Sequence, residues 1–419
     1  MKKLKEIFKN KQLKETTWSL LSKSITLVLF LLINIFLARK LGVESFGLWS
    51  LYLSIMTILF SLSYFGINNS SGKFIAQYNY TDNLKGVLLS SLKLRLIFSL
   101  IFTILLIIFY KNLATIFNNK ELESLLFYGI PLIFLSGIVE YLKSVFIGLH
   151  RIKYNFIINL SEYGLKLFLI FLFLMFSANI ITVINSFILS LFITSLIGGY
   201  LLYFNFYKNL KSTNINFTSQ ILSYSYPIVF ITLGFIALTE IDTVMIGYFL
   251  GGSEVGIYAV AKQIIIKLPH LSVALSMGIM PIFAKLNEEN KLQLKKKFFN
   301  LFKIVLVIYG MTSVAILFIS PLLIPFIFGT EYTKSVLPLQ ILIVYLFCFS
   351  ASIIMSSFLD YTGKAKKRAY NISFTMVLNI LLNLTLIPKF GATGAALATS
   401  ISYLPYVVLN WIEVKKSLT

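Results

Sequence analysis

Apolar stretches long enough to cross a lipid bilayer recur from one end of this 419-residue chain to the other. The first includes ITLVLFLLINIFLA (residues 25–38), and similar stretches follow at short intervals. An α-helix needs about 20 apolar residues to cross a bilayer, and an isolated strand cannot satisfy its backbone hydrogen bonds in lipid. A membrane β-barrel would need short segments of alternating polarity instead of continuous apolar runs. The chain is therefore predicted to be an all-α polytopic membrane protein.

Composition supports this class and removes several others. Hydrophobic residues make up 58% of the chain and charged residues 13%, whereas an ordinary soluble domain carries about 25% charged residues. The single cysteine, Cys348, excludes an intramolecular disulfide, and no Cys/His cluster has the spacing of a metal site. The chain has no complete phosphate-binding motif of the P-loop type. We therefore expect no cofactor, no bound metal and no ATP hydrolysis.

The breaks between the apolar runs predict twelve membrane helices in two six-helix lobes. Their expected limits are 17–38, 46–68, 86–110, 122–149, 154–176, 180–206, 221–250, 254–284, 297–328, 335–359, 369–388 and 392–412. The N-lobe would span 17–206 and the C-lobe 221–412, joined by a cytoplasmic linker at 207–220. A basic segment at 1–16 is expected to lie at the cytoplasmic interface, and residues 413–419 form a cytoplasmic tail.

The net charge of +21 is explained by membrane topology. If the N-terminus is inside, most lysines and arginines fall on inner segments, including the runs at 285–297 and 364–368. Positively charged loops remain on the cytoplasmic side, so both termini are predicted to be cytoplasmic. A strongly basic soluble protein would point to nucleic acid, but here nucleic acid is not expected as a partner.

One glycine-containing turn sequence occurs twice in the chain. The stretch LGVESFGLW (41–49) and the stretch LGGSEVGIY (250–258) align Gly42 and Gly47 with Gly251 and Gly256. The first turn joins predicted spans one and two, and the second joins spans seven and eight. Because six is even, the two halves are predicted to be parallel repeats, related by a pseudo-twofold axis around a central cavity. Chance recurrence of glycine turns is the alternative, but the offset that aligns the two turns also aligns Phe74 with Phe283, and two matches at one offset disfavour chance.

The phrases ARKLGVESFGLWSLYLSI, IDTVMIGYFLGGSEVGIYAVAK and GIMPIFAKL resemble a known family. They are similar to the polysaccharide-exporter branch of the multidrug/oligosaccharidyl-lipid/polysaccharide (MOP) superfamily, and within it to Wzx-type flippases for O-antigen and capsule repeat units. The resemblance implies translocation of an undecaprenyl-pyrophosphate-linked oligosaccharide across a bacterial cytoplasmic membrane by alternating access, without an enzymatic step. It also implies a cation-lined cavity, coupling to protons or sodium, contact with membrane lipid, and a polysaccharide polymerase as partner.

Charged residues inside the predicted spans are the candidate functional residues, because buried charges in a membrane are costly and usually face a cavity or each other. The lysines are candidates for binding the substrate diphosphate: Lys23, Lys143, Lys166, Lys262 and Lys267. The acids are candidates for coupling or gating: Glu140, Glu162, Glu240 and Asp242. Glu140 precedes Lys143 by three residues and Glu162 precedes Lys166 by four, so structural pairing along one helix fits these four equally well.

Asp242 and Lys262 lie at similar depths on the two helices that meet at the second glycine turn. We therefore predict an Asp242–Lys262 ion pair with Glu240 as a second carboxylate nearby. A static brace of the helical hairpin and a contact exchanged during transport both fit this prediction.

Two other functions remain open at this point. A proton- or sodium-coupled exporter of small drugs would share the architecture but favour an acidic cavity for cationic substrates. A membrane glycosyltransferase or polymerase would need catalytic groups in a sizeable outer loop, whereas the predicted outer connections are short.

Overall fold

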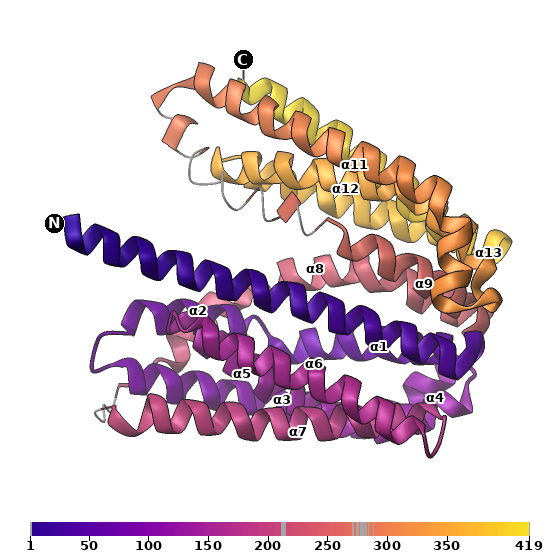
Figure 1. Cartoon of the computed structure of the whole chain (residues 1–419), viewed down its shortest axis with the longest axis horizontal. Helices are drawn as coiled ribbons and strands as arrows, with labels where there is room; N and C mark the ends of the chain where they lie inside the picture. The colour runs from indigo at the N-terminus through magenta and orange to yellow at the C-terminus, as the bar shows by residue number, and fades with distance from the viewer. Residues whose placement is uncertain are drawn as a thin grey trace. The chain divides into compact units, whose positions relative to one another are not determined.

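A computed structural model describes residues 2–210, 215–269, 272–273, 276, 283, 285–287 and 289–418. Within these ranges the chain forms helices joined by short turns, and no β-strand (Figure 1). The helices are α1 (Lys2–Tyr64), α2 (Ile67–Tyr78), α3 (Leu84–Ile116), α4 (Lys120–Tyr128), α5 (Ile130–Gly148), α6 (Ile152–Leu174), α7 (Ile180–Asn205), η1 (Tyr207–Asn209), α8 (Thr218–Leu250), α9 (Gly252–Lys267), α11 (Lys291–Phe328), η2 (Thr330–Ser335), α12 (Val336–Tyr361) and α13 (Ala365–Leu418).

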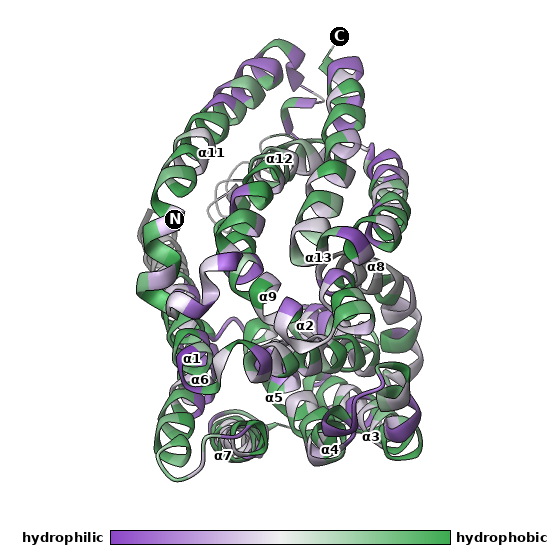
Figure 2. Ribbon diagram, turned by 90° about the vertical axis from the view of Figure 1, so that its right-hand side faces the viewer, coloured by the Kyte–Doolittle hydropathy of each residue, from purple (hydrophilic) through white to green (hydrophobic). Residues whose placement is uncertain are grey.

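Eight helical segments of the described chain are long and apolar enough to cross a membrane. Their bodies are hydrophobic along most of their length, as Figure 2 shows. Two of them, α1 and α13, each combine two predicted spans across a kink, at Gly42 and at Gly391. The prediction of an all-α, multi-pass membrane protein is therefore confirmed.

Some predicted limits differ from the structure. The predicted span 122–149 is two helices, α4 and α5, which meet at Gly129. Proline at position 131 lacks a backbone N–H and is tolerated only in the first turn of a helix, which favours a new start there. The predicted interfacial segment 1–16 is continuous with the first span, because α1 begins at Lys2. Much of the predicted span 254–284 beyond α9 lies outside the described residues.

The chain divides into two compact units. Unit 1 comprises Met1–Leu41 and Tyr52–Ile236, and unit 2 comprises Gly42–Leu51 and Ala237–Thr419. This division passes through the middle of α8, whereas the linker between the predicted lobes is at 207–220. The tip that follows the first glycine turn belongs to unit 2, although the helical segments on both sides of it belong to unit 1.

The two copies of the glycine turn share one backbone conformation. Gly42 has φ 75° and ψ 172°, and Gly251 has φ 82° and ψ −167°. These angles lie in a region that only glycine occupies without strain, because a side chain would collide with the backbone. The repeated sequence thus encodes a repeated local geometry.

The second glycine of each turn allows close helix packing within unit 2. A Cβ on Gly47 would overlap the carbonyl oxygen of Gly252, and one on Gly256 would overlap the carbonyl oxygen of Val43. Gly252 and Gly256 are four residues apart, the spacing that lets two membrane helices cross at backbone contact. This crossing attaches the tip 42–51 to α9.

Candidate functional site

Four charged side chains form one ionic cluster inside unit 1. On α5, Lys143 Nζ lies 2.6 Å from Glu140 Oε1, and on α6, Lys166 Nζ lies 2.5 Å from Glu162 Oε1. Both predicted pairs along one helix are confirmed. The structure adds a link between the helices, since Lys143 Nζ is also 2.6 Å from Glu162 Oε2. Glu162 therefore bridges the two lysines, and with Glu140 it balances their charge.

The ionic cluster borders a cavity of about 120 Å³ in unit 1. Its polar wall includes Glu140, Glu162 and Lys166, and its aromatic wall includes Tyr64 and Phe187. Lys166 Nζ lies 4.7 Å from the centroid of the Phe187 ring, a distance at which the ring attracts the cation. The space is large enough for several water molecules or a small polar group.

A fifth charged side chain of unit 1, Arg95 on α3, is not among the residues that the sequence predicted for the site. Its side chain is fully buried and donates hydrogen bonds to the carbonyl oxygens of Ser63 (2.6 Å) and Gly137 (3.0 Å). The guanidinium also lies 4.4 Å from the ring centroid of Tyr64, which lines the cavity. The sequence held a signal, because Arg95 lies inside the predicted span 86–110.

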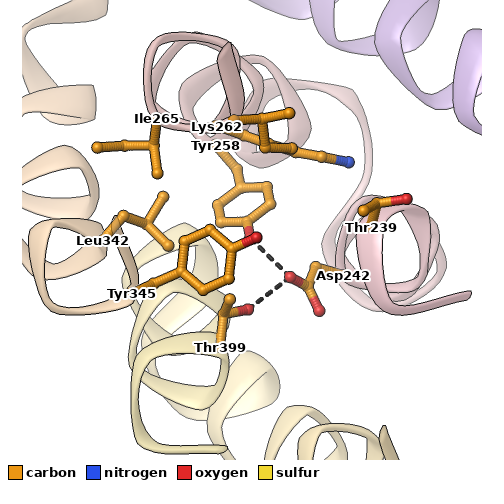
Figure 3. A pocket seen from close by; sticks show the side chains of 9 residues that line it. Thr239, Asp242, Tyr258, Lys262, Ile265, Leu342, Tyr345 and Thr399 are labelled. Carbon is orange, nitrogen blue, oxygen red and sulfur yellow. Dashed lines mark hydrogen bonds between the residues drawn. The ribbon is translucent and has the colours of Figure 1, made fainter. Parts of the chain in front are cut away.

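Unit 2 holds a carboxylate cage around Asp242. The aspartate of α8 is 2% exposed and accepts hydrogen bonds from Tyr258 of α9 (2.7 Å) and Thr399 of α13 (2.5 Å). Figure 3 shows both hydroxyl groups pointing at the carboxylate. Asn383 of α13 donates a third hydrogen bond, at 2.7 Å. All three donors are electrically neutral.

The predicted Asp242–Lys262 ion pair is wrong. Lys262 Nζ instead contacts Glu240 Oε2 at 2.9 Å and the Thr243 hydroxyl at 2.8 Å. The residue predicted as the second carboxylate is thus the lysine's partner, whereas the aspartate is satisfied by residues of α9 and α13. Similar depth on two adjoining helices was a necessary condition for the pair but did not fix which acid faces the lysine.

The cage continues into α13 through residues that sequence reasoning did not select. Asn383 Nδ2 also donates to Asn379 Oδ1 (3.0 Å), and Asn379 Nδ2 lies 3.4 Å from the hydroxyls of Thr399 and Ser402. The buried Asn383 Oδ1 accepts no hydrogen bond from the described residues. A cavity of about 20 Å³, room for about one water, lies beside Asp242. The signal in the sequence was a pair of asparagines four residues apart in an apolar run, FTMVLNILLNL.

The remaining predicted lysines lie outside these two clusters. Lys23 is on an exposed face of α1, and Lys267 is the partly buried last residue of α9. The structure thus places four of the predicted charged residues in the ionic cluster of unit 1. Asp242 and the Glu240–Lys262 pair lie at the carboxylate cage of unit 2, and Lys23 and Lys267 belong to neither. Among the described residues, no group of three or more His, Cys, Asp or Glu side chains is placed to hold a metal.

Sequence comparison identifies relatives of this chain. Residues 12–287 match the family described as Polysaccharide biosynthesis protein, and residues 227–385 match the MatE family. An uncharacterised membrane protein of Methanocaldococcus jannaschii is 29% identical over 413 residues, with 93% of this chain and 94% of that protein covered. Capsular polysaccharide biosynthesis protein CapF of Staphylococcus aureus is 25% identical over 309 residues, with 71% and 76% covered.

Solved structures of low sequence identity share the fold. A multidrug resistance MATE family transporter of the MOP superfamily, in an inward-facing conformation, has a TM-score of 0.75 at 16% identity, with 94% of both chains covered. The lipid II flippase MurJ, in an inward closed conformation, has a TM-score of 0.73 at 18% identity, with 96% of this chain and 89% of that chain covered. The chain therefore belongs to the polysaccharide biosynthesis protein family and has the helical transporter fold of the MOP superfamily.

Proposed function

We propose that this protein is a flippase that carries a lipid-linked oligosaccharide from the inner to the outer leaflet of its membrane. The observation that carries the proposal is the ionic cluster in a chain of this family, in which Lys166 lines a cavity and Lys143 is paired with Glu140 and Glu162 of the cavity wall. A diphosphate linking lipid and sugar is a compact anion that two lysines can bind strongly where water is scarce. Relatives whose names describe capsule biosynthesis and a "Probable low-salt glycan biosynthesis flippase" support this substrate class.

The geometry of the cluster gives a way to release the substrate. Glu162 contacts both Lys143 and Lys166, and Glu140 contacts Lys143, so the two lysines are charge-balanced without a substrate. An entering diphosphate would compete with Glu162 for the same two ammonium groups. Because Glu162 is placed to form its ion pairs with the lysines again when the diphosphate leaves, binding remains reversible, as transport requires. Arg95, held by neutral groups beside Tyr64, adds a fixed positive charge to this region.

We assign ion coupling to the carboxylate cage of unit 2. The tyrosine and threonine hydroxyls around Asp242 can act as donors or acceptors, so the cage can adjust to a neutral or a cation-bound carboxylate. A proton or a sodium ion would meet the charge requirement. Glu140 and Glu240, on the more exposed sides of their pairs, are proposed as gating residues.

The proposed setting follows the family resemblance. The substrate would be an undecaprenyl-pyrophosphate-linked repeat unit for O-antigen or capsule, the membrane a bacterial cytoplasmic membrane, and both termini cytoplasmic. A polysaccharide polymerase would consume the translocated product. The protein itself would break no covalent bond.

Transport in proteoliposomes tests the proposal. A fluorescent, short-chain polyprenyl-diphosphate sugar is incorporated, and its exposure at the outer surface is followed by chemical quenching. We expect Lys166→Gln to slow flipping at least tenfold, and Lys303→Gln, which removes an exposed lysine of α11, to leave it unchanged. The paired variant Glu162→Gln/Lys166→Gln serves as the control if the single variant is unstable. Equal flipping by protein and empty liposomes, or by all variants, would overturn the proposal.

An exporter of small organic cations is the second candidate. The MatE match and the carboxylates of both clusters favour it. Gene deletion separates the two functions. Accumulation of one polyprenyl-linked oligosaccharide, seen by mass spectrometry, supports the flippase, whereas an unchanged lipid profile with new drug sensitivity supports the exporter.

A further inference from the structure

Exposed lysines gather at one end of unit 2, on three helix ends that are far apart in the sequence. They are Lys291, Lys295, Lys296 and Lys297 of α11, Lys364, Lys366 and Lys367 around the start of α13, and Lys415 and Lys416 at its end. We call this set the basic patch. Figure 2 shows hydrophilic residues at the beginning of α11 and at the end of α13, near the C-terminus.

Aromatic packing joins the start of α11 to the end of α12 and to the end of α13 beneath the basic patch. The Phe302 ring of α11 stacks on Trp411 of α13 with centroids 5.2 Å apart. Phe298 of α11 contacts Phe358 of α12 at 5.0 Å and Trp411 at 6.4 Å. The lysines therefore project from one rigid base.

Among the described residues, acids are paired with only a few cations of this region. Asp360 is paired with Arg368 at 2.8 Å, and Glu413 lies 3.8 Å from Lys416. The first turns of α11 and α13 contain no acidic residue, so their lysines oppose the positive end of each helix dipole. Helix stability thus does not explain the lysines at the starts of α11 and α13, whereas Lys415 and Lys416 lie in the last turn of α13, where a cation is favourable.

Three loop cations of unit 1 lie over aromatic rings, as Lys415 of the basic patch does over Trp411 at 5.5 Å. Lys73 Nζ lies 3.6 Å from the ring centroid of Tyr224, and Lys85 Nζ lies 5.0 Å from that of Tyr207. The Arg151 guanidinium lies 5.6 Å from the Phe206 ring. These cations are engaged by aromatic rings of their own unit, whereas the lysines of α11 and of the turn before α13 extend from the protein surface.

The surface between the lysines is apolar. Leu292 is 79% exposed, Tyr370 63% and Phe299 37%. A soluble acidic partner would not require this mixture, but the headgroup layer of a membrane matches it, because cations meet phosphates there and apolar side chains enter the acyl region. We propose that the basic patch binds anionic phospholipid headgroups and so fixes this end of unit 2 in a negatively charged leaflet. This inference does not depend on the transported substrate.

Lipid titration of the purified full-length chain in neutral detergent tests the inference without any influence of membrane topology. Native mass spectrometry measures binding of phosphatidylglycerol and phosphatidylcholine. The test variant is Lys295→Gln/Lys296→Gln/Lys297→Gln, and the matched control is Lys93→Gln/Lys153→Gln/Lys208→Gln, which removes three exposed lysines of unit 1. A lysine near an anionic surface contributes about 1 kcal/mol, so we expect up to about a fivefold loss of phosphatidylglycerol affinity per lysine removed in the test variant.

Further comparisons keep the inference open to refutation. A second variant, Lys364→Gln/Lys366→Gln/Lys367→Gln, should show a similar loss, which covers the case in which the first variant does not fold. Raised salt should weaken binding of phosphatidylglycerol and leave phosphatidylcholine unaffected. Equal affinity for the two lipids, or the same loss in the control variant, would overturn the proposal and leave the basic patch as a topology signal alone.

Discussion

The two units bury acidic side chains in opposite ways. In unit 1, Glu162 is held by two ammonium groups at 2.5 and 2.6 Å. In unit 2, Asp242 is held by a phenol, a hydroxyl and an amide, with the neighbouring Lys262 engaged by Glu240. Neutralising a salt-bridged carboxylate leaves the charge of its partners uncompensated. A carboxylate that accepts hydrogen bonds from neutral groups can change its own charge with less disturbance. This difference is the basis for the proposed roles, charge balance in unit 1 and ion coupling in unit 2.

The largest effect is expected from Glu162→Ala. This change leaves Lys143 and Lys166 without their shared carboxylate in a buried site, and removing one partner of a buried ion pair typically costs about 3–5 kcal/mol. The thermal unfolding midpoint of the purified protein should fall by several degrees. Glu289→Ala, which removes one side of the exposed Lys285–Glu289 pair, provides the control and should leave the midpoint nearly unchanged. Equal midpoints for the two variants would show that the ionic cluster is not required for stability.

Arg95→Met tests whether a cation in unit 1 can resemble Asp242 in being held by neutral groups. The methionine cannot donate hydrogen bonds to the carbonyl oxygens of Ser63 and Gly137, and each unsatisfied buried group costs about 1–3 kcal/mol. Loss of the guanidinium also removes the cost of burying it, so we expect a net loss of about 2 kcal/mol in the free energy of unfolding. Arg95→Lys keeps the positive charge but has fewer hydrogen-bond donors. Its free energy of unfolding should lie between that of the parent and that of Arg95→Met. A methionine variant as stable as the parent would mean that these hydrogen bonds contribute little.

The smallest change in stability is expected from Asp242→Asn. The new amide can keep its oxygen towards Tyr258 and Thr399, and flips of both the Asn383 and the Asn379 amide keep a donor facing an acceptor, at the cost of the two 3.4 Å hydrogen bonds that Asn379 donates. The free energy of unfolding should therefore change by about 1 kcal/mol or less. Transport driven by a proton or sodium gradient should nevertheless be lost, while flipping without a gradient persists. A strongly destabilised variant, or one that still responds to both gradients, would remove the distinction between the two units.

Part of the site was accessible from the sequence because it depends on local geometry. Residues three or four apart on a helix face each other, so the pairs Glu140–Lys143 and Glu162–Lys166 could be predicted before any contact was known. The Lys143–Glu162 link and the burial of Arg95 depend on how α3, α5 and α6 pack. No local spacing encodes that packing.

The sequence by itself determined that the chain crosses a membrane many times as helices, because apolar length and backbone hydrogen bonding allow few other solutions. The sequence also determined the backbone conformation of the repeated turn, since Gly42 and Gly251 adopt φ and ψ angles that other residues avoid. Only the tertiary structure decided the partners of Asp242. Thr399 and Asn383 lie 157 and 141 residues further along the chain, and they reach the aspartate because α13 packs against the helices that follow Ala237. Helix packing, rather than similar depth on two adjoining helices, places these neutral donors next to Asp242 in place of Lys262.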